Sequence, residues 1–97
     1  MAASPPVSAL PWYARPDYPV LLKLFSDPDK LPATYDAWLE RAERVERQLQ
    51  KAEFDVVRIR IRPVSFSAWC KERMVSPDQA ARLTFVNEAA RDLAAQR

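Results

Sequence analysis

The sequence predicts one α+β domain that is mostly α, with the order helix, helix, strand, helix, helix. Residues 55–62, DVVRIRIR, alternate apolar and arginine side chains, which is the period of a half-buried β-strand. Four other segments space their apolar residues by three and four positions, as amphipathic helices do. The length of 97 residues suits a single domain with a modest core.

The first fourteen residues, MAASPPVSALPWYA, are rich in proline and alanine and carry no charged side chain. We expect residues 1–14 to form a flexible arm whose end can dock through Trp12 or Tyr13, and residues 15–97 to form the domain. No run approaches the roughly 18 apolar residues of a membrane helix, and no signal-peptide pattern opens the chain. With a single cysteine, Cys70, these features predict a cytoplasmic protein.

The first two helices are predicted from apolar stripes and caps. One stripe consists of Tyr18, Leu21, Leu22 and Phe25, with Asp17 as the cap. After the turn SDPDKLP, Thr34 caps a helix of about residues 35–51. Its apolar seam, which we expect to face the core, consists of Tyr35, Trp38, Ala42, Val45, Leu49 and Ala52.

Two more helices follow the strand. Pro63 starts a short one with Phe66, Trp69, Cys70 and Met74 on its apolar side. In SPDQ (76–79), Ser76 is the predicted N-cap, Pro77 takes the first helical position and Gln79 completes a capping box. The last helix runs to about residue 95 and has the predicted seam Leu83, Val86, Ala90 and Leu93.

The composition excludes several kinds of chemistry. The chain has no glycine, which phosphate-cradling loops and dinucleotide fingerprints require. It has no histidine, so Cys70 has no imidazole partner and zinc lacks a ligand set. Asp27 and Asp29 are better explained as turn and capping residues than as cation ligands. We therefore expect a non-catalytic protein without a cofactor or metal.

The predicted strand needs a partner, because an unpaired strand leaves backbone groups without hydrogen bonds. No other segment predicts a strand, so we expect antiparallel pairing with the same strand of a second subunit in a homodimer. The apolar face of this dimer strand would consist of Val57, Ile59 and Ile61. Its outer face would carry Arg58, Arg60 and Arg62.

Three stretches, SDPDKLPATYDAWLERAE, FSAWC and PDQAARLTFVNEAA, resemble a group of small bacterial proteins of unknown function over about residues 12–92. In that group glycine commonly ends the helices near positions 53 and 75. This chain has Glu53 and Val75 there, so both helix ends must close without a glycine cap.

Residues 55–95, a strand followed by a short helix, a turn and a longer helix, resemble ribbon–helix–helix repressors. The resemblance implies a two-stranded ribbon that enters the major groove of DNA. Arg58, Arg60 and Arg62 would then read base edges. Ser76 and the amides after it would hold a phosphate.

Two functions remain open. The first is a small cytoplasmic interaction or regulatory module whose arginine face is solvated or binds an acidic protein. The second is DNA binding through that face, which lies in the more basic half of the chain: residues 54–97 hold eight basic and five acidic side chains. A third feature is a set of aromatic residues that could line a peptide groove, although their helical spacing is more typical of a core: Tyr35, Trp38, Phe66, Trp69 and Phe85.

Overall fold

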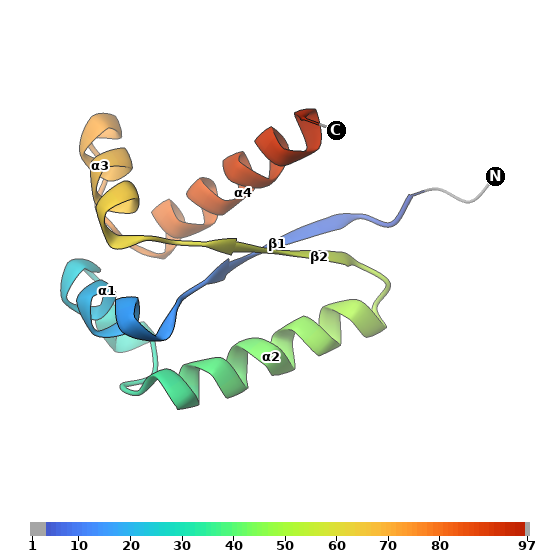
Figure 1. Cartoon of the computed structure of the whole chain (residues 1–97), viewed down its shortest axis with the longest axis horizontal. Helices are drawn as coiled ribbons and strands as arrows, with labels where there is room; N and C mark the ends of the chain where they lie inside the picture. The colour runs from blue at the N-terminus through green and yellow to red at the C-terminus, as the bar shows by residue number, and fades with distance from the viewer. Residues whose placement is uncertain (1–3, 97) are drawn as a thin grey trace.

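The computed structural model describes residues 4–96 and has two layers of helices around a small sheet (Figure 1). Its elements are β1 (Val7–Trp12), the 3-10 helix η1 (Arg15–Asp17), α1 (Tyr18–Leu24), the 3-10 helix η2 (Pro28–Lys30), α2 (Tyr35–Lys51), β2 (Asp55–Arg60), α3 (Pro63–Arg73) and α4 (Gln79–Ala95). The prediction of a mostly helical α+β fold is confirmed. Among the described residues, no helix is both long and apolar enough to cross a membrane.

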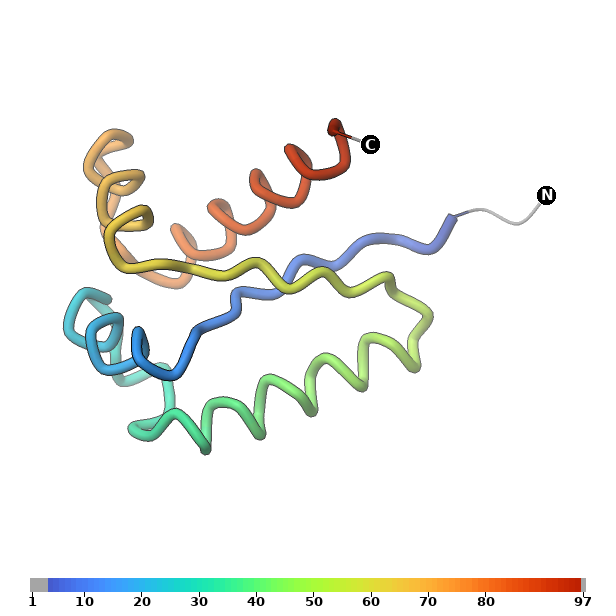
Figure 2. The backbone as a smooth tube through the Cα atoms, viewed as in Figure 1, coloured from blue at the N-terminus to red at the C-terminus, as the bar shows by residue number. Residues whose placement is uncertain are grey.

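The sheet consists of β1 and β2, which pair in parallel with Val7 opposite Asp55 and Trp12 opposite Arg60. The prediction that the strand pairs antiparallel with a second subunit is therefore wrong, because β2 has its partner in the same chain. Parallel strands need a crossover of a dozen or more residues, and α1 and α2 supply it. Figure 2 shows β1 and β2 side by side although both helices lie between them in the sequence.

β1 was not predicted from the sequence, and it is formed by residues 7–12 of the predicted arm. Proline has no backbone N–H, so Pro11 argues against a strand in the interior of a sheet. At a sheet edge the missing N–H costs no hydrogen bond between strands. The predicted docking of the arm through its aromatic residues is confirmed. Tyr13 is only 2% exposed, and the rings of Trp12 and Tyr13 lie 5.2 and 4.8 Å from that of Trp38. Residues 1–3 of the predicted arm lie outside the described residues.

The two long helices cover opposite faces of the sheet, α2 on one and α4 on the other (Figure 1). Parallel sheets are normally covered on both faces in this way. The core lies where the sheet meets α1, α3 and α4. Its most deeply buried side chains are Tyr13, Tyr18, Leu21, Ile61, Phe66 and Val86.

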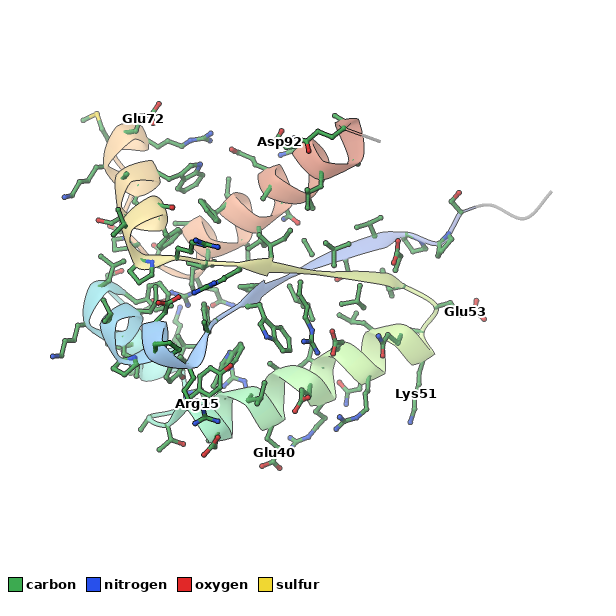
Figure 3. The ribbon with its side chains drawn as sticks, in the orientation of Figure 1. Arg15, Glu40, Lys51, Glu53, Glu72 and Asp92 are labelled. Atoms are coloured by element: carbon green, nitrogen blue, oxygen red, sulfur yellow. The ribbon has the colours of Figure 1, made fainter. Side chains whose placement is uncertain are left out.

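The helix α2 has the bounds that the sequence predicts. The Oγ1 atom of Thr34 accepts a hydrogen bond from the Ala37 amide at 3.2 Å, so the predicted cap is confirmed. Glu40 and Lys51 point away from the sheet (Figure 3). The predicted seam is buried only at Trp38, while Val45 is 39% exposed, because the second half of α2 lies beside an open cleft.

The predicted cap of α4 is wrong, and of its predicted seam Val86 and Ala90 face the core but Leu83 and Leu93 do not. Asp78 is the N-cap, since its Oδ1 accepts from the Ala81 amide at 3.0 Å, and Ser76 lies outside the helix. Leu83 and Leu93 are 43% and 47% exposed. The face of α4 that packs against the core instead carries Ala81, Arg82, Phe85, Val86, Ala89 and Ala90. The pattern misplaced this face because it treats an arginine as exposed, whereas Arg82 is buried.

Two residues with a side chain adopt the left-handed backbone conformation that glycine usually supplies. Glu53, at the end of α2 (Figure 3), has φ 67°, and Met74, at the end of α3, has φ 57°. The amides of Glu53 and Phe54 bond back to the carbonyls of Gln50 and Leu49, which is the Schellman pattern. Both helix ends thus close without glycine, as the sequence requires. Met74 was predicted to face the core, but it is 91% exposed.

Candidate functional site

The predicted arginine face is largely occupied by contacts within the chain. Arg58 donates from Nε and Nη2 to the two carboxylate oxygens of Glu46 in α2, both at 2.7 Å. Its guanidinium carbon also lies 3.8 Å from the ring centroid of Trp12. Arg60 donates to Asp17 at 2.9 Å. These contacts hold the sheet against α2 and η1.

The other predicted site residues lie apart from these arginines. Arg62 is exposed at the start of α3, and Ser76 is exposed in the turn before α4. The predicted dimer strand is covered by the chain's own helices: Ile59 and Ile61 are 7% and 0% exposed, and Val57 packs against the same core. The structure therefore does not gather Arg58, Arg60, Arg62 and Ser76 into one surface.

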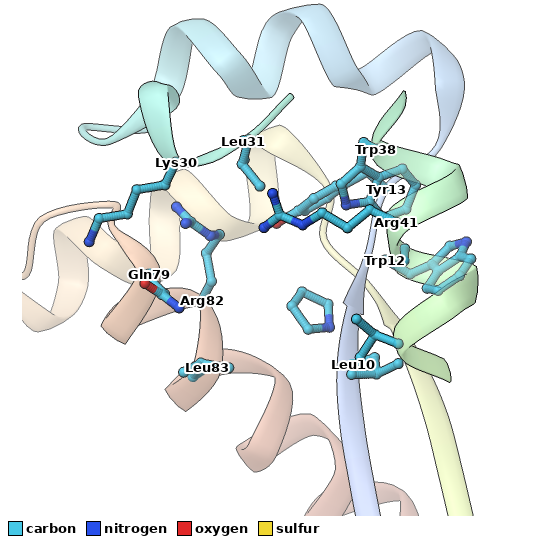
Figure 4. Close-up of a pocket in the computed structure, with 13 residues that line it drawn as sticks. Leu10, Trp12, Tyr13, Lys30, Leu31, Trp38, Arg41, Gln79, Arg82 and Leu83 are labelled. Atoms are coloured by element: carbon cyan, nitrogen blue, oxygen red, sulfur yellow. The ribbon is translucent and has the colours of Figure 1, made fainter. Parts of the chain in front are cut away.

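A cleft of about 460 Å³ opens at the carboxyl-terminal end of β1, between α2 and α4 (Figure 4). Its volume lies within the range of small-ligand sites, roughly 300–1,000 Å³. The walls are mainly apolar and come from Leu10, Pro11, Trp12, Leu31, Trp38, Ala42, Val45 and Leu83. The polar side chains in the lining are Tyr13, Lys30, Arg41, Gln79 and Arg82. This lining contains three cations and no carboxylate.

Arg82 forms the fixed cationic wall of the cleft. It is 4% exposed, and its two terminal nitrogens donate to the carboxylate of Asp27 at 2.7 and 3.2 Å. Its guanidinium also lies 4.4 Å from the ring centroid of Phe25. The Gln79 amide donates to the same carboxylate at 3.0 Å. Hydrogen bonding to Arg82 lowers the pKa of Asp27, so at neutral pH the pair is ionised and balanced.

Arg41 is the unbalanced cation. Within residues 4–96 its side chain makes no hydrogen bond and no ion pair, whereas Arg44, one turn later in α2, is paired with Glu40 at 3.2 Å. The spacing along the sequence does not mark this difference, because Arg47 follows Glu43 by four positions and also makes no ion pair within residues 4–96. Figure 4 shows the Arg41 side chain lying beside Tyr13 and reaching into the cleft.

Tyr13 supplies a hydrogen-bond donor at the floor of the cleft. Its ring is buried, and its hydroxyl bonds to no other described residue. Every inaccessible side-chain nitrogen or oxygen in this part of the chain has a partner, so the Tyr13 hydroxyl must open into the cleft. Burial raises the pKa of Tyr13 to about 12, against the opposing effect of Arg82. At neutral pH the phenol is therefore protonated and able to donate.

The chemistry of the cleft follows from these groups. A phenol donor, an unpaired guanidinium and Lys30 surround a space that no acidic side chain lines. Guanidinium and ammonium groups have no acceptor to offer the phenol. The complementary ligand is an anion whose oxygens accept from Tyr13 and Arg41 and whose remaining atoms are apolar, to match Trp38, Val45 and Leu83.

No protein-family model, curated protein or solved structure matches this chain. The candidate site therefore rests on its geometry alone.

Proposed function

We propose that this protein is a non-catalytic binding module that holds an organic anion with an apolar body in the cleft between α2 and α4. The observation that carries the proposal is the Tyr13 hydroxyl, a donor on a side chain that is 2% exposed and that lacks a partner among residues 4–96. Because this hydroxyl opens into the cleft, it is available to donate a hydrogen bond to an acceptor on a ligand. Arg41 supplies the charge that selects an anion.

The groups in the cleft support binding rather than catalysis. The lining contains no serine, threonine, cysteine or carboxylate. Tyr13, with a pKa of about 12, is a poor general base near neutral pH. Cys70 is buried in α3 and does not line the cleft.

DNA binding is not the function that we propose. Two of the three arginines that would read bases are bonded to Glu46 and Asp17. Reaching a DNA groove would require breaking both ion pairs and the stacking of Arg58 on Trp12. The homodimer was expected because the strand had no partner, and β1 now provides that partner.

The test uses 4-phenylbutyrate as the probe and 4-phenylbutanamide as its neutral match. We expect the acid to quench the fluorescence of Trp12 or Trp38 and the amide to bind about tenfold or more weakly, because a hydrogen bond to a charged group contributes about 1.5–3 kcal/mol. Arg41→Ala should weaken binding by a similar factor. Its matched control is Arg44→Ala, which removes an arginine from the same helix but not from the cleft.

Tyr13→Phe gives a second, independent readout. The hydroxyl makes no bond within the described chain. The free energy of unfolding of the variant, measured in urea, should therefore match that of the wild type within about 0.5 kcal/mol. The variant should nevertheless bind the acid less tightly. Equal binding of the acid by the wild type, Arg41→Ala and Tyr13→Phe would contradict the proposal, as would equal binding of the acid and the amide.

A further inference from the structure

The outer edge of β1 is open, and it leads into the cleft. The Asp55 amide donates to the Pro6 carbonyl at 2.8 Å, and the Ile61 amide donates to the Trp12 carbonyl at 2.9 Å. Every second residue of a parallel strand faces a given neighbour. The even-numbered residues of β1 therefore point their backbone groups at β2. The backbone groups of Val7, Ala9 and Pro11 point the other way, and no backbone bond from the described turns, loops or helix caps reaches them.

Four consecutive residues line the cleft: Leu10, Pro11 and Trp12 at the end of β1, and Tyr13 directly after it. Side chains of consecutive strand residues point to opposite faces of a sheet, so a cleft that touches all four lies along the strand edge rather than on one face. Figure 4 shows α2 on one side of this edge and α4 on the other. An extended chain laid along β1 would enter between the two helices.

Pro11 limits what such a chain can be. Its ring removes the last backbone donor on the outer edge of β1, so a long partner strand, such as a second copy of β1, could not complete its ladder here. Lys30 and Leu31 also line the cleft, and Figure 4 shows them to one side of β1, toward α4. A chain that ends in the cleft would place its terminus next to Tyr13 and Arg41.

We infer that the ligand is the carboxyl-terminal segment of another polypeptide, added as a third strand parallel to β1. Its backbone bonds to the outward amide of Ala9 and the outward carbonyls of Ala9 and Pro11. Its terminal carboxylate accepts from Tyr13 and Arg41, with Arg82 and Lys30 adding positive charge. Its last side chain lies against Trp38, Val45 or Leu83. Strand addition of this kind takes affinity from main-chain bonds and specificity from side-chain pockets. The inference rests on the anion site of the proposed function.

The experiment is a competition between two pools of random pentapeptides with an apolar last residue, one with free carboxyl termini and one amidated. The purified protein is incubated with both pools, and the retained peptides are counted by mass spectrometry. We expect the free acids to be enriched about tenfold or more, since a carboxylate hydrogen bond contributes that factor. Enrichment should be lost with Arg41→Ala and kept with Arg44→Ala.

Ala9→Pro separates this inference from the proposed function. It removes an outward amide of β1 without touching a bond to β2, and a proline is tolerated at such an edge position. The variant should still bind 4-phenylbutyrate, which also shows that it is folded, but it should no longer enrich peptides. A retained peptide N-methylated two residues before its end should likewise bind more weakly to the wild type, because it cannot donate to the β1 edge.

Peptide enrichment that survives both Ala9→Pro and N-methylation would overturn strand addition and leave the anion site standing. Binding of phenylbutyrate without any enrichment of free-acid peptides would also overturn it. Failure of both phenylbutyrate and the peptides to bind would remove the proposed function as well.

Discussion

Asp27→Asn should destabilise this protein far more than its position in a turn suggests. The Asp27 side chain is 12% exposed and bonds Arg82, which is 5% exposed, at 2.7 Å. It also accepts from the first amide of α4 at 3.0 Å, so one carboxylate fastens the segment after α1 to the start of α4. Asparagine keeps the shape but removes the charge, and arginine cannot lose its proton to compensate.

The magnitude follows from the burial of Arg82. Removing one partner of a buried pair costs about 3–5 kcal/mol, because the other charge stays buried without its counter-ion. A domain of this size is stable by only about 5–15 kcal/mol. A loss of about 3 kcal/mol should lower the melting temperature by roughly 12–24 °C. Urea unfolding followed by tryptophan fluorescence measures the change directly.

The matched control is Glu40→Gln, which breaks the exposed pair with Arg44, whose side chains are 74% and 58% exposed. It should cost no more than about 0.5 kcal/mol. Asp27→Asn, unlike Glu40→Gln, should also remove a part of the folding stability that depends on pH. The pKa of Asp27 is lowered from 3.8, so its contribution is complete above that value and is lost as the pH falls through the lower folded-state pKa. A loss below about 1 kcal/mol for Asp27→Asn at pH 7 would refute this account of the pair.

Three further predictions concern other parts of the chain. Met74→Gly should stabilise the protein by about 0.5–1 kcal/mol, because the left-handed conformation costs a residue with a Cβ more than glycine loses in entropy; Lys71→Gly, inside α3, should instead destabilise it, and urea unfolding compares the two. Cys70→Ser should cost about 1–3 kcal/mol, and iodoacetamide at pH 7 should label the native thiol far more slowly than the unfolded one, because burial raises its pKa. Arg58→Ala should cost roughly 1–2 kcal/mol through its ion pair and its stacking on Trp12, whereas Arg62→Ala should stay within about 0.5 kcal/mol; equal losses for the two would contradict the contacts seen at Arg58.

The elements predicted correctly are those whose signals are local. The cap of α2 lies in Thr34 and the three residues after it, and the buried stripe of α1 lies within eight residues, so periodicity alone places both. The strand at residues 55–60 is likewise marked by its own alternation. None of these predictions required knowing what the segment packs against.

Apart from the cap of α4 and the exposed Met74, the failures involve contacts between distant segments. β1 has a weak strand composition and contains Pro11, and its partner β2 is separated from it in the sequence by α1 and α2. Arg82 is buried because Asp27, 55 positions earlier, neutralises it, and no pattern along α4 contains that information. The cleft joins Tyr13, Arg41 and Arg82 from three distant segments, and no pattern along the sequence marks any of the three as a cleft residue.

The position of the cleft follows from the proportions of this fold. Two helices of 17 residues each, α2 and α4, cover a sheet of only two strands. A helix with its side chains is about 10–12 Å across, whereas two strands lie only about 4.8 Å apart, so the helix layers extend beyond the sheet at its edges. At the edge of β1 this overhang encloses unpaired backbone groups, the Tyr13 hydroxyl and the Arg41 side chain in one space. On the face covered by α2, Arg58 stacks on Trp12 and donates to Glu46, which fixes the sheet to α2. The same narrow sheet therefore has one face fastened by an ion pair and, at the edge of β1, a cleft with a phenol donor and a guanidinium.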